Sequence, residues 1–343
     1  MAGKSSKKDT STSNASASAF GWDFQANAAI LLMLENIQQA KSIKVEAATE
    51  DIEITLDNNN IIYSQAKSIE DINSKSNLIE KLKDGIRTLN NAYNNGDAEN
   101  LIYITNHSNP FNDKTSIQYF LGRKKYDYND LPDKCKNKVL KIINENNYNL
   151  DTNKLKVYIL PFLGRDRDNK DSAIKEAVSE FLESLEIYSS FTPKRMLEIW
   201  QRDFFQNATV PDNAIQIKKE KMIWTLIAET CEFDRLDRQL ENCDDAAIDE
   251  IAHRYQSIIN NKTEDFQFFN KVISDYSEFN KQLSLKERTE KFVNEEYVRY
   301  LEEFNVKELD DYMKSCLIKV IINKIISKRI IIDKIKKGAN ICN

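Results

Sequence analysis

Residues 50–68 read EDIEITLDNNNIIYSQAKS and predict a β-hairpin in which charged and amide side chains stand among apolar ones. The runs DIEITL and IIYSQA are rich in Ile, Thr and Tyr, which favour strands, and the turn-forming stretch DNNN joins them. Asp51 begins the first run, whereas Gln65 and Lys67 end the second. Because the start of one hairpin strand lies beside the end of the other, these three side chains can converge.

The register of the hairpin decides whether the three side chains share one face of the sheet. Side chains alternate along a strand, so the simplest register, with Asp51 opposite Ala66, turns Asp51 away from Gln65 and Lys67. A shift of one residue, or a bulge, instead pairs Asp51 with Lys67 and brings Gln65 to the same face. A shared site requires this shift, and we therefore expect it.

The segments around the hairpin predict an α/β domain with the element order α-β-β-β-α-β. Helices are indicated by apolar residues at helical spacing, and strands by short runs of β-branched and aromatic residues. The expected helices are 20–40, 76–94 and a stretch near 132–146, and the expected strands beside the hairpin are 42–47, 101–106 and 154–160.

Beyond about residue 170 every segment predicts helix, and no convincing hairpin follows. We therefore expect a flexible arm at 1–19, an α/β domain at 20–170 and an all-α domain at 171–343. The segment 316–338 alternates Ile clusters with Lys, so as a helix it has an Ile face. Three interpretations of this helix remain open: membrane-surface binding, partner binding, or packing within its own domain. Its IIID stretch is also compatible with a terminal strand.

The composition is that of a helical protein with a core. Hydrophobic residues make up 41% of the 343 residues and charged residues 30%, while only 7 Gly and 5 Pro leave little material for the turns of an all-β fold. The net charge of -5 disfavours a protein that coats DNA, but a nuclease needs only a local basic rim beside an acidic site.

The cysteine and histidine content restricts the cellular compartment and the kinds of catalysis that we expect. The 5 cysteines are scattered without a C-x-x-C pair, which is typical of a reducing cytoplasm rather than of a disulfide framework or a zinc site. Only 2 histidines are present, which disfavours catalysis built on paired histidines. We see no secretory signal or membrane-spanning run near the N-terminus, and we expect a cytoplasmic protein without membrane attachment.

The side chains of Asp51, Gln65 and Lys67 suit metal-assisted hydrolysis of a phosphodiester. A hard cation such as Mg²⁺ prefers oxygen ligands, which a carboxylate and an amide carbonyl provide. The cation polarises a phosphoryl oxygen and lowers the pKa of a bound water, while a nearby Lys can orient that water or offset negative charge. Glu46 or Glu53 can add a second carboxylate. The alternative is a solvated pattern of cross-strand charges, which contributes roughly a few tenths of a kcal/mol per pair.

The stretches GWDFQANAAILLML, KVEAATEDIEI and IIYSQAKS resemble the PD-(D/E)XK nucleases. The resemblance is closest to the branch with Gln in the third motif, which includes Mrr-type enzymes and effector nucleases of bacterial antiphage defence systems. It implies a restriction-endonuclease-like domain with a mixed sheet over about residues 20–165. It implies catalytic roles for Asp51, Gln65, Lys67, Glu46 and Gln25, and a Mg²⁺ or Mn²⁺ ion held by Asp51, Gln65 and Glu46.

The sequence departs from the family pattern at two positions of this site. Glu50 stands where the family has the Pro that precedes the metal-binding Asp. Gln65 stands where many members have a carboxylate, which reduces the negative charge that faces a cation and makes Glu46 more important.

The resemblance also implies partners. It points to double-stranded DNA as substrate, to a sensor or ATPase subunit that docks on the helical half, and to self-association on activation. Candidate phosphate contacts are Lys41, Lys44, Lys75, Arg123, Lys124 and Lys125. Two other classes remain open, namely a non-catalytic adaptor subunit with a nuclease-like scaffold and an RNA-directed nuclease.

Overall fold

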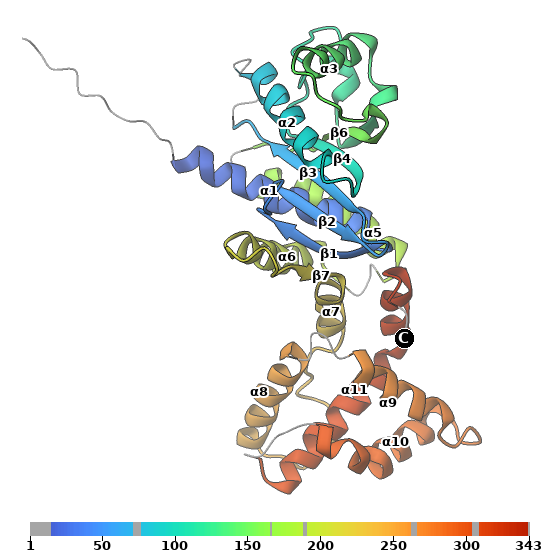
Figure 1. Cartoon of the computed structure of the whole chain (residues 1–343). Helices are drawn as coiled ribbons and strands as arrows, with labels where there is room; N and C mark the ends of the chain where they lie inside the picture. Colours follow the sequence, from blue (N-terminus) through green and yellow to red (C-terminus); the bar gives the residue numbers. More distant parts are fainter. Residues whose placement is uncertain are drawn as a thin grey trace, which may run out of the picture. The chain divides into compact units, whose positions relative to one another are not determined.

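The computed structural model describes residues 15–70, 77–164, 167–187, 191–261, 266–303 and 309–341 (Figure 1). The chain divides into two compact units that interleave along the sequence. The first unit lies within residues 1–33, 43–174 and 201–216, and the second within 34–42, 175–200 and 217–343. Most of the predicted arm at 1–19 lies outside the described residues, although the first helix already begins at Ala15.

A mixed seven-stranded sheet has the strand order β5-β6-β4-β3-β2-β1-β7. The strands are β1 Ala40–Val45, β2 Ile52–Leu56, β3 Ile61–Lys67, β4 Ala98–Thr105, β5 Lys124–Asp127, β6 Leu155–Ile159 and β7 Ile217–Lys218. Strand β3 runs antiparallel to β2 and parallel to β4, β4 is parallel to β6, and β5 is antiparallel to β6. The strands predicted from the sequence are all present, whereas β5 and β7 were not predicted.

Helices account for most of the rest of the described chain. They are α1 Ala15–Glu35, α2 Leu78–Tyr93, α3 Asp133–Glu145, α4 Arg167–Lys170, α5 Ser172–Ser184, α6 Pro193–Ala208, α7 Lys219–Thr230, α8 Asp245–Asn261, α9 Phe266–Glu278, α10 Leu285–Glu296 and α11 Asp311–Gly338. The order α1-β1-β2-β3-α2-β4 confirms the predicted α-β-β-β-α-β succession, and a helical region follows it.

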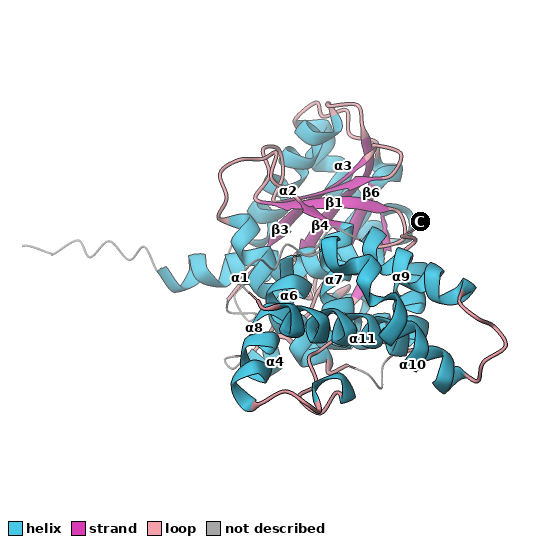
Figure 2. Ribbon diagram, turned by 90° about the horizontal axis from the view of Figure 1, so that it is seen from below, coloured by secondary structure: helices cyan, strands magenta, loops and turns pink. Residues whose placement is uncertain are grey.

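Both faces of the sheet are covered. Tyr63 and Tyr103 face the side where α2 and α3 pack, and they share a core with Leu82 of α2. Side chains of the opposite face, such as Ile54 and Ile102, are also buried, and α1 crosses this second face (Figure 2). The hairpin strands therefore lie between helices, so a polar side chain on them is withdrawn from bulk water.

The turn of the β2–β3 hairpin is tighter than the sequence suggested. The Leu56 N–H donates to the Asn60 carbonyl at 2.9 Å, so that Asn60 belongs to the ladder and residues 57–59 form the loop. Asn59 adopts the left-handed conformation with φ 65°, which Asn tolerates better than most residues. A three-residue loop that ends in a left-handed residue is a common hairpin connection.

This turn sets the register that the site depends on. Ile52 lies opposite Ser64, so the same register places Asp51 opposite Gln65. The expected pairing of Asp51 with Lys67 was wrong, because the short loop shifts the register in the other direction. The result still brings Asp51 and Gln65 to one face, and Lys67 shares that face because side chains alternate.

Helix α11 is the centre of the second unit. It contacts α7, α8, α9 and α10, and Ile322, Ile325 and Ile332 on it are fully buried. Of the interpretations of segment 316–338, the structure supports packing within its own unit, and it shows a helix rather than a terminal strand. A search of the described residues for a helix able to cross a membrane found none.

Candidate active site

Asp51 and Gln65 form the centre of the candidate site. Oδ2 of Asp51 accepts a hydrogen bond from the Ala66 N–H at 2.8 Å and another from Nε2 of Gln65. Burial raises the pKa of Asp51, while the Ala66 N–H and the charge of Lys67 act to lower it. The carboxylate is therefore fixed against the end of β3, in surroundings that favour a nearby positive charge.

Helix α2, which packs on the face of the sheet to which Gln65 points, positions the Gln65 amide. The Thr88 hydroxyl donates to Oε1 of Gln65 at 2.7 Å. The helix can approach this closely because Gly85 has no side chain, since a Cβ there would lie 2.5 Å from the Tyr103 ring. Thr88 and Gly85 were not identified from the sequence, because only the docking of α2 brings them to the site.

Lys67 is held by an ion pair with α2. Its Nζ lies 2.8 Å from Oδ2 of Asp84, and this contact lowers the pKa of Asp84. Burial raises the pKa of Asp51 and Glu50, and the positive charge of Lys67 acts against this rise. The ammonium group thus lies within electrostatic reach of the carboxylates that a cation would use.

Glu46 and Gln25 extend the site toward β1 and α1. The Glu46 N–H donates to the Asp51 carbonyl at 2.7 Å, which places the two residues opposite each other where β1 turns into β2. Glu46 has a left-handed backbone with φ 53°, and such strain concentrates at functional sites. Burial and the charge of Asp51 raise the pKa of Glu46, and hydrogen bonding with Gln25 lowers the pKa of both carboxyls. All five predicted site residues therefore meet in one region.

Glu53, the alternative second carboxylate, has a different task. Its Oε1 accepts hydrogen bonds from the backbone N–H groups of Thr49 and Glu50, at 3.2 and 3.3 Å. Through Oε1 the side chain thereby stabilises the bend that leads into β2.

Glu50 is a residue of this region to which the sequence gave no role. Only 3% of it is exposed, and within the described part of the chain neither carboxylate oxygen has a hydrogen-bond partner. Burial and the neighbouring charge of Asp51 raise the pKa of Glu50 to about 8. The available signal was its departure from the family pattern, an acidic residue directly before Asp51.

The residues present fit a divalent cation. Half-buried or buried carboxyls with raised pKa values are stabilised in their charged form by added positive charge, and Mg²⁺ and Mn²⁺ accept carboxylate and amide oxygens. Among the residues that the structure describes, no three His, Cys, Asp or Glu side chains form a ready metal-binding group.

One expected phosphate contact was wrong. Lys44 is 1% exposed, and its Nζ donates to the carbonyls of Asn207 and Val210, each at 3.0 Å. Burial lowers the pKa of Lys44. The side chain ties segments of the first unit together and cannot reach a phosphate. Lys75 lies outside the described residues, whereas Lys124 is exposed on strand β5.

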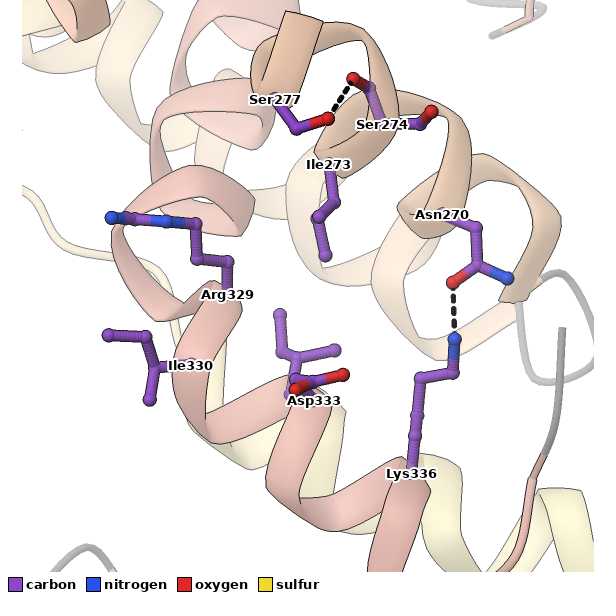
Figure 3. A pocket seen from close by; sticks show the side chains of 9 residues that line it. Asn270, Ile273, Ser274, Ser277, Arg329, Ile330, Asp333 and Lys336 are labelled. Carbon is purple, nitrogen blue, oxygen red and sulfur yellow. Dashed lines mark hydrogen bonds between the residues drawn. The ribbon is translucent and has the colours of Figure 1, made fainter.

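The second unit contains a hollow of about 390 Å³ between α9 and α11 (Figure 3). Its polar side chains bond to the unit itself: Lys336 donates to Oδ1 of Asn270, and the Ser277 hydroxyl donates to the Ser274 carbonyl at 2.8 Å. Arg329 donates to a backbone carbonyl of its own helix. The volume is that of a small-ligand pocket, but the groups that line it do not assemble a reactive site.

Comparison of the chain with protein-family models, with curated proteins and with solved structures found no match. The geometry of the hairpin site is therefore the ground on which a function can be proposed.

Proposed function

We propose that the protein is a metal-dependent endodeoxyribonuclease that hydrolyses phosphodiester bonds at the Asp51 site. The observation that carries this proposal is the convergence of Asp51, Gln65 and Lys67 at one end of the β2–β3 hairpin, with Oδ2 of Asp51 bonded to Gln65 and to the Ala66 N–H. The α-β-β-β-α-β order and the mixed sheet support a restriction-endonuclease-like fold of the PD-(D/E)XK type.

The proposed chemistry divides among the chain's own residues. Asp51, Glu46 and the Gln65 carbonyl would hold Mg²⁺ or Mn²⁺, which would supply Lewis-acid activation of the phosphate and of water. Lys67 orients the attacking water and offsets the negative charge that develops on the phosphate. Gln25 hydrogen-bonds the two carboxyls and keeps them in place.

We further propose double-stranded DNA as the substrate, cut with little sequence specificity, because phosphate chemistry requires no base readout. A nuclease of this kind needs control, and we propose that the protein is the cytoplasmic effector of an antiphage defence complex. The second unit would then bind a sensor or ATPase subunit, or associate with itself on activation. Exposed apolar side chains on this unit, such as Leu236 and Ile330, are available for such contacts.

The test is cleavage of plasmid DNA in the presence of Mg²⁺ by the wild-type protein, by Asp51→Asn and by Asp57→Asn. Asp57 is an exposed residue of the hairpin turn, so its variant is a matched loss of one carboxylate. We expect cleavage by wild type and Asp57→Asn, little by Asp51→Asn, and none after addition of EDTA.

Three other outcomes would indicate a different site, function or substrate. Cleavage that survives Asp51→Asn would mean that the site is misassigned. Absence of cleavage by wild type, alone and with proteins recovered from the native host, favours the adaptor function. Single-stranded RNA assayed in parallel distinguishes an RNA-directed nuclease.

A further inference from the structure

Glu50 occupies an environment that a carboxylate alone does not tolerate well. The residue is 3% exposed, and among the described residues neither of its oxygens accepts a hydrogen bond. Removing a carboxylate from water without such bonds is among the costlier events in folding. In native proteins most buried polar groups have a partner, so a group without one in the chain calls for another explanation, such as an ion or a water molecule.

The neighbouring donors are already committed. The Thr88 hydroxyl has a single proton, which it donates to Oε1 of Gln65 at 2.7 Å. Lys67 is ion-paired with Asp84 at 2.8 Å. Both groups lie close enough to Glu50 to act on its pKa. Among the described residues, neither group donates a hydrogen bond to Glu50.

Glu50 lies next to Asp51, in the bend that leads into the site. It lies in the bend between β1 and β2, where the Ala47 N–H donates to the Glu50 carbonyl at 3.1 Å. Glu50 precedes Asp51 and lies in the bend rather than in the ladder of β2. The charges of Asp51 and Lys67 both act on the pKa of the Glu50 carboxyl.

We infer that Glu50 is a further ligand of the divalent cation, which it shares with Asp51 at the start of β2. This inference rests on the proposed function, because it concerns the same site. The cation would be the missing partner of the buried carboxylate. Glu50 would add a full negative charge to a site in which Gln65 contributes only an amide. Two adjacent carboxylates would then hold the ion from the bend, with the amide of β3 opposite them.

The test is Mn²⁺ binding to the full-length protein, measured by electron paramagnetic resonance of the free ion and by the rise in melting temperature that Mn²⁺ causes. Glu50→Gln keeps the size of the side chain and removes its charge. Glu53→Gln is the matched control, because Glu53 lies in the same hairpin but bonds to the backbone. We expect Glu50→Gln to raise the Kd for Mn²⁺ about 10-fold or more and Glu53→Gln to change it less than about twofold.

The outcomes separate this inference from the proposed function. Wild-type affinity in Glu50→Gln, together with loss of binding in Asp51→Asn, overturns the inference alone. Absence of Mn²⁺ binding by the wild type overturns both proposals. If Glu50→Gln fails to fold, as judged by circular dichroism, Glu50→Asp takes its place. That variant keeps the charge but withdraws the oxygens, so weaker Mn²⁺ binding supports the inference and unchanged binding overturns it.

Discussion

The two compact units differ in what they bury. Among the described residues, buried polar side chains are concentrated in the first unit: Asn27, Lys44, Glu50, Ser64, Gln65, Asn90, Thr105, Asn106, His107, Asn109, Ser116, Asp171, Gln201 and Asn207. The second unit buries Ser42, Lys219 and Lys336. Burial of a polar group costs free energy unless it is compensated. The first unit is therefore where a functional site is expected.

Burial alone does not distinguish a site residue from a structural one. Asn106 is buried and fully used, since it bonds both backbone groups of Ile69 at 2.8 Å and the Phe162 carbonyl at 3.2 Å. Lys44 is similarly bonded to two carbonyls. Glu50 differs, because neither of its oxygens is bonded within the described chain. Buried Asp171 has one oxygen without a partner, but its other oxygen is bonded, so Glu50 is distinguished by having neither oxygen bonded.

The largest effect is expected for Lys67→Ala. If Lys67 stabilises charge in the transition state, its loss should slow DNA cleavage by about 10³-fold, with little change in the melting temperature. The measurement is the single-turnover rate on plasmid DNA with saturating Mg²⁺. Lys83→Ala is the control, because Lys83 is an exposed lysine of α2 that pairs with Glu80, and its rate should stay within about twofold. A Lys67→Ala rate close to wild type would remove Lys67 from the mechanism.

The sequence predicted the local elements of the first unit because their signals are local. Alternating β-branched runs and the DNNN stretch define the hairpin, and helical spacing defines α1 and α2. The register was missed because the ladder continues through Asn60, which the sequence had assigned to the turn. Strand β5 was missed because three of its four residues are charged, and its pairing to β6 depends on contacts distant in sequence.

Of the site, the residues on the hairpin could be predicted from the sequence, but those contributed by α2 could not. Asp51, Gln65 and Lys67 lie on one hairpin, so spacing along two short strands brings them together. Thr88 and Asp84 come from a separate helix, and only its close packing over the sheet determines that they touch Gln65 and Lys67. No short-range pattern carries that information.

If the second unit also shapes the cation site, a change in the core of that unit should alter cation binding. Trp224 is 2% exposed, and its indole N–H donates to the Ile259 carbonyl at 2.8 Å. Trp224→Phe removes this bond and part of the packing, which should lower the free energy of unfolding by about 1–3 kcal/mol. Chemical denaturation measures this loss. We expect an unchanged Kd for Mn²⁺, and a several-fold change would show that the second unit also shapes the cation site.

A smaller effect is expected for Thr88→Val, which keeps the shape of the side chain but removes its hydroxyl. Oε1 of Gln65 then loses the donor that orients the amide. We expect the Kd for Mn²⁺ to rise about 10-fold, because such supporting hydrogen bonds tune metal affinity. Thr88→Ser restores the hydroxyl and should bind Mn²⁺ nearly as the wild type does. Equal binding by the two variants would mean that α2 supports the site through packing alone.

The smallest effect concerns the ion pair between Lys67 and Asp84, whose Nζ and Oδ2 lie 2.8 Å apart. This contact and the ion pair of Asp84 with Arg87 lower the pKa of Asp84 in the folded protein. They therefore stabilise the fold above the ordinary carboxyl pKa of about 4, and their contribution is lost as pH falls through the lower folded value. Because the carboxylate is more than a third exposed, Asp84→Asn should lower the free energy of unfolding by only about 0.5 kcal/mol at pH 7. Urea unfolding of both proteins from pH 7 to pH 2.5 measures the difference, which should shrink toward zero at the acidic end. A difference that stays constant over this range would show that Asp84 positions Lys67 by packing rather than by charge.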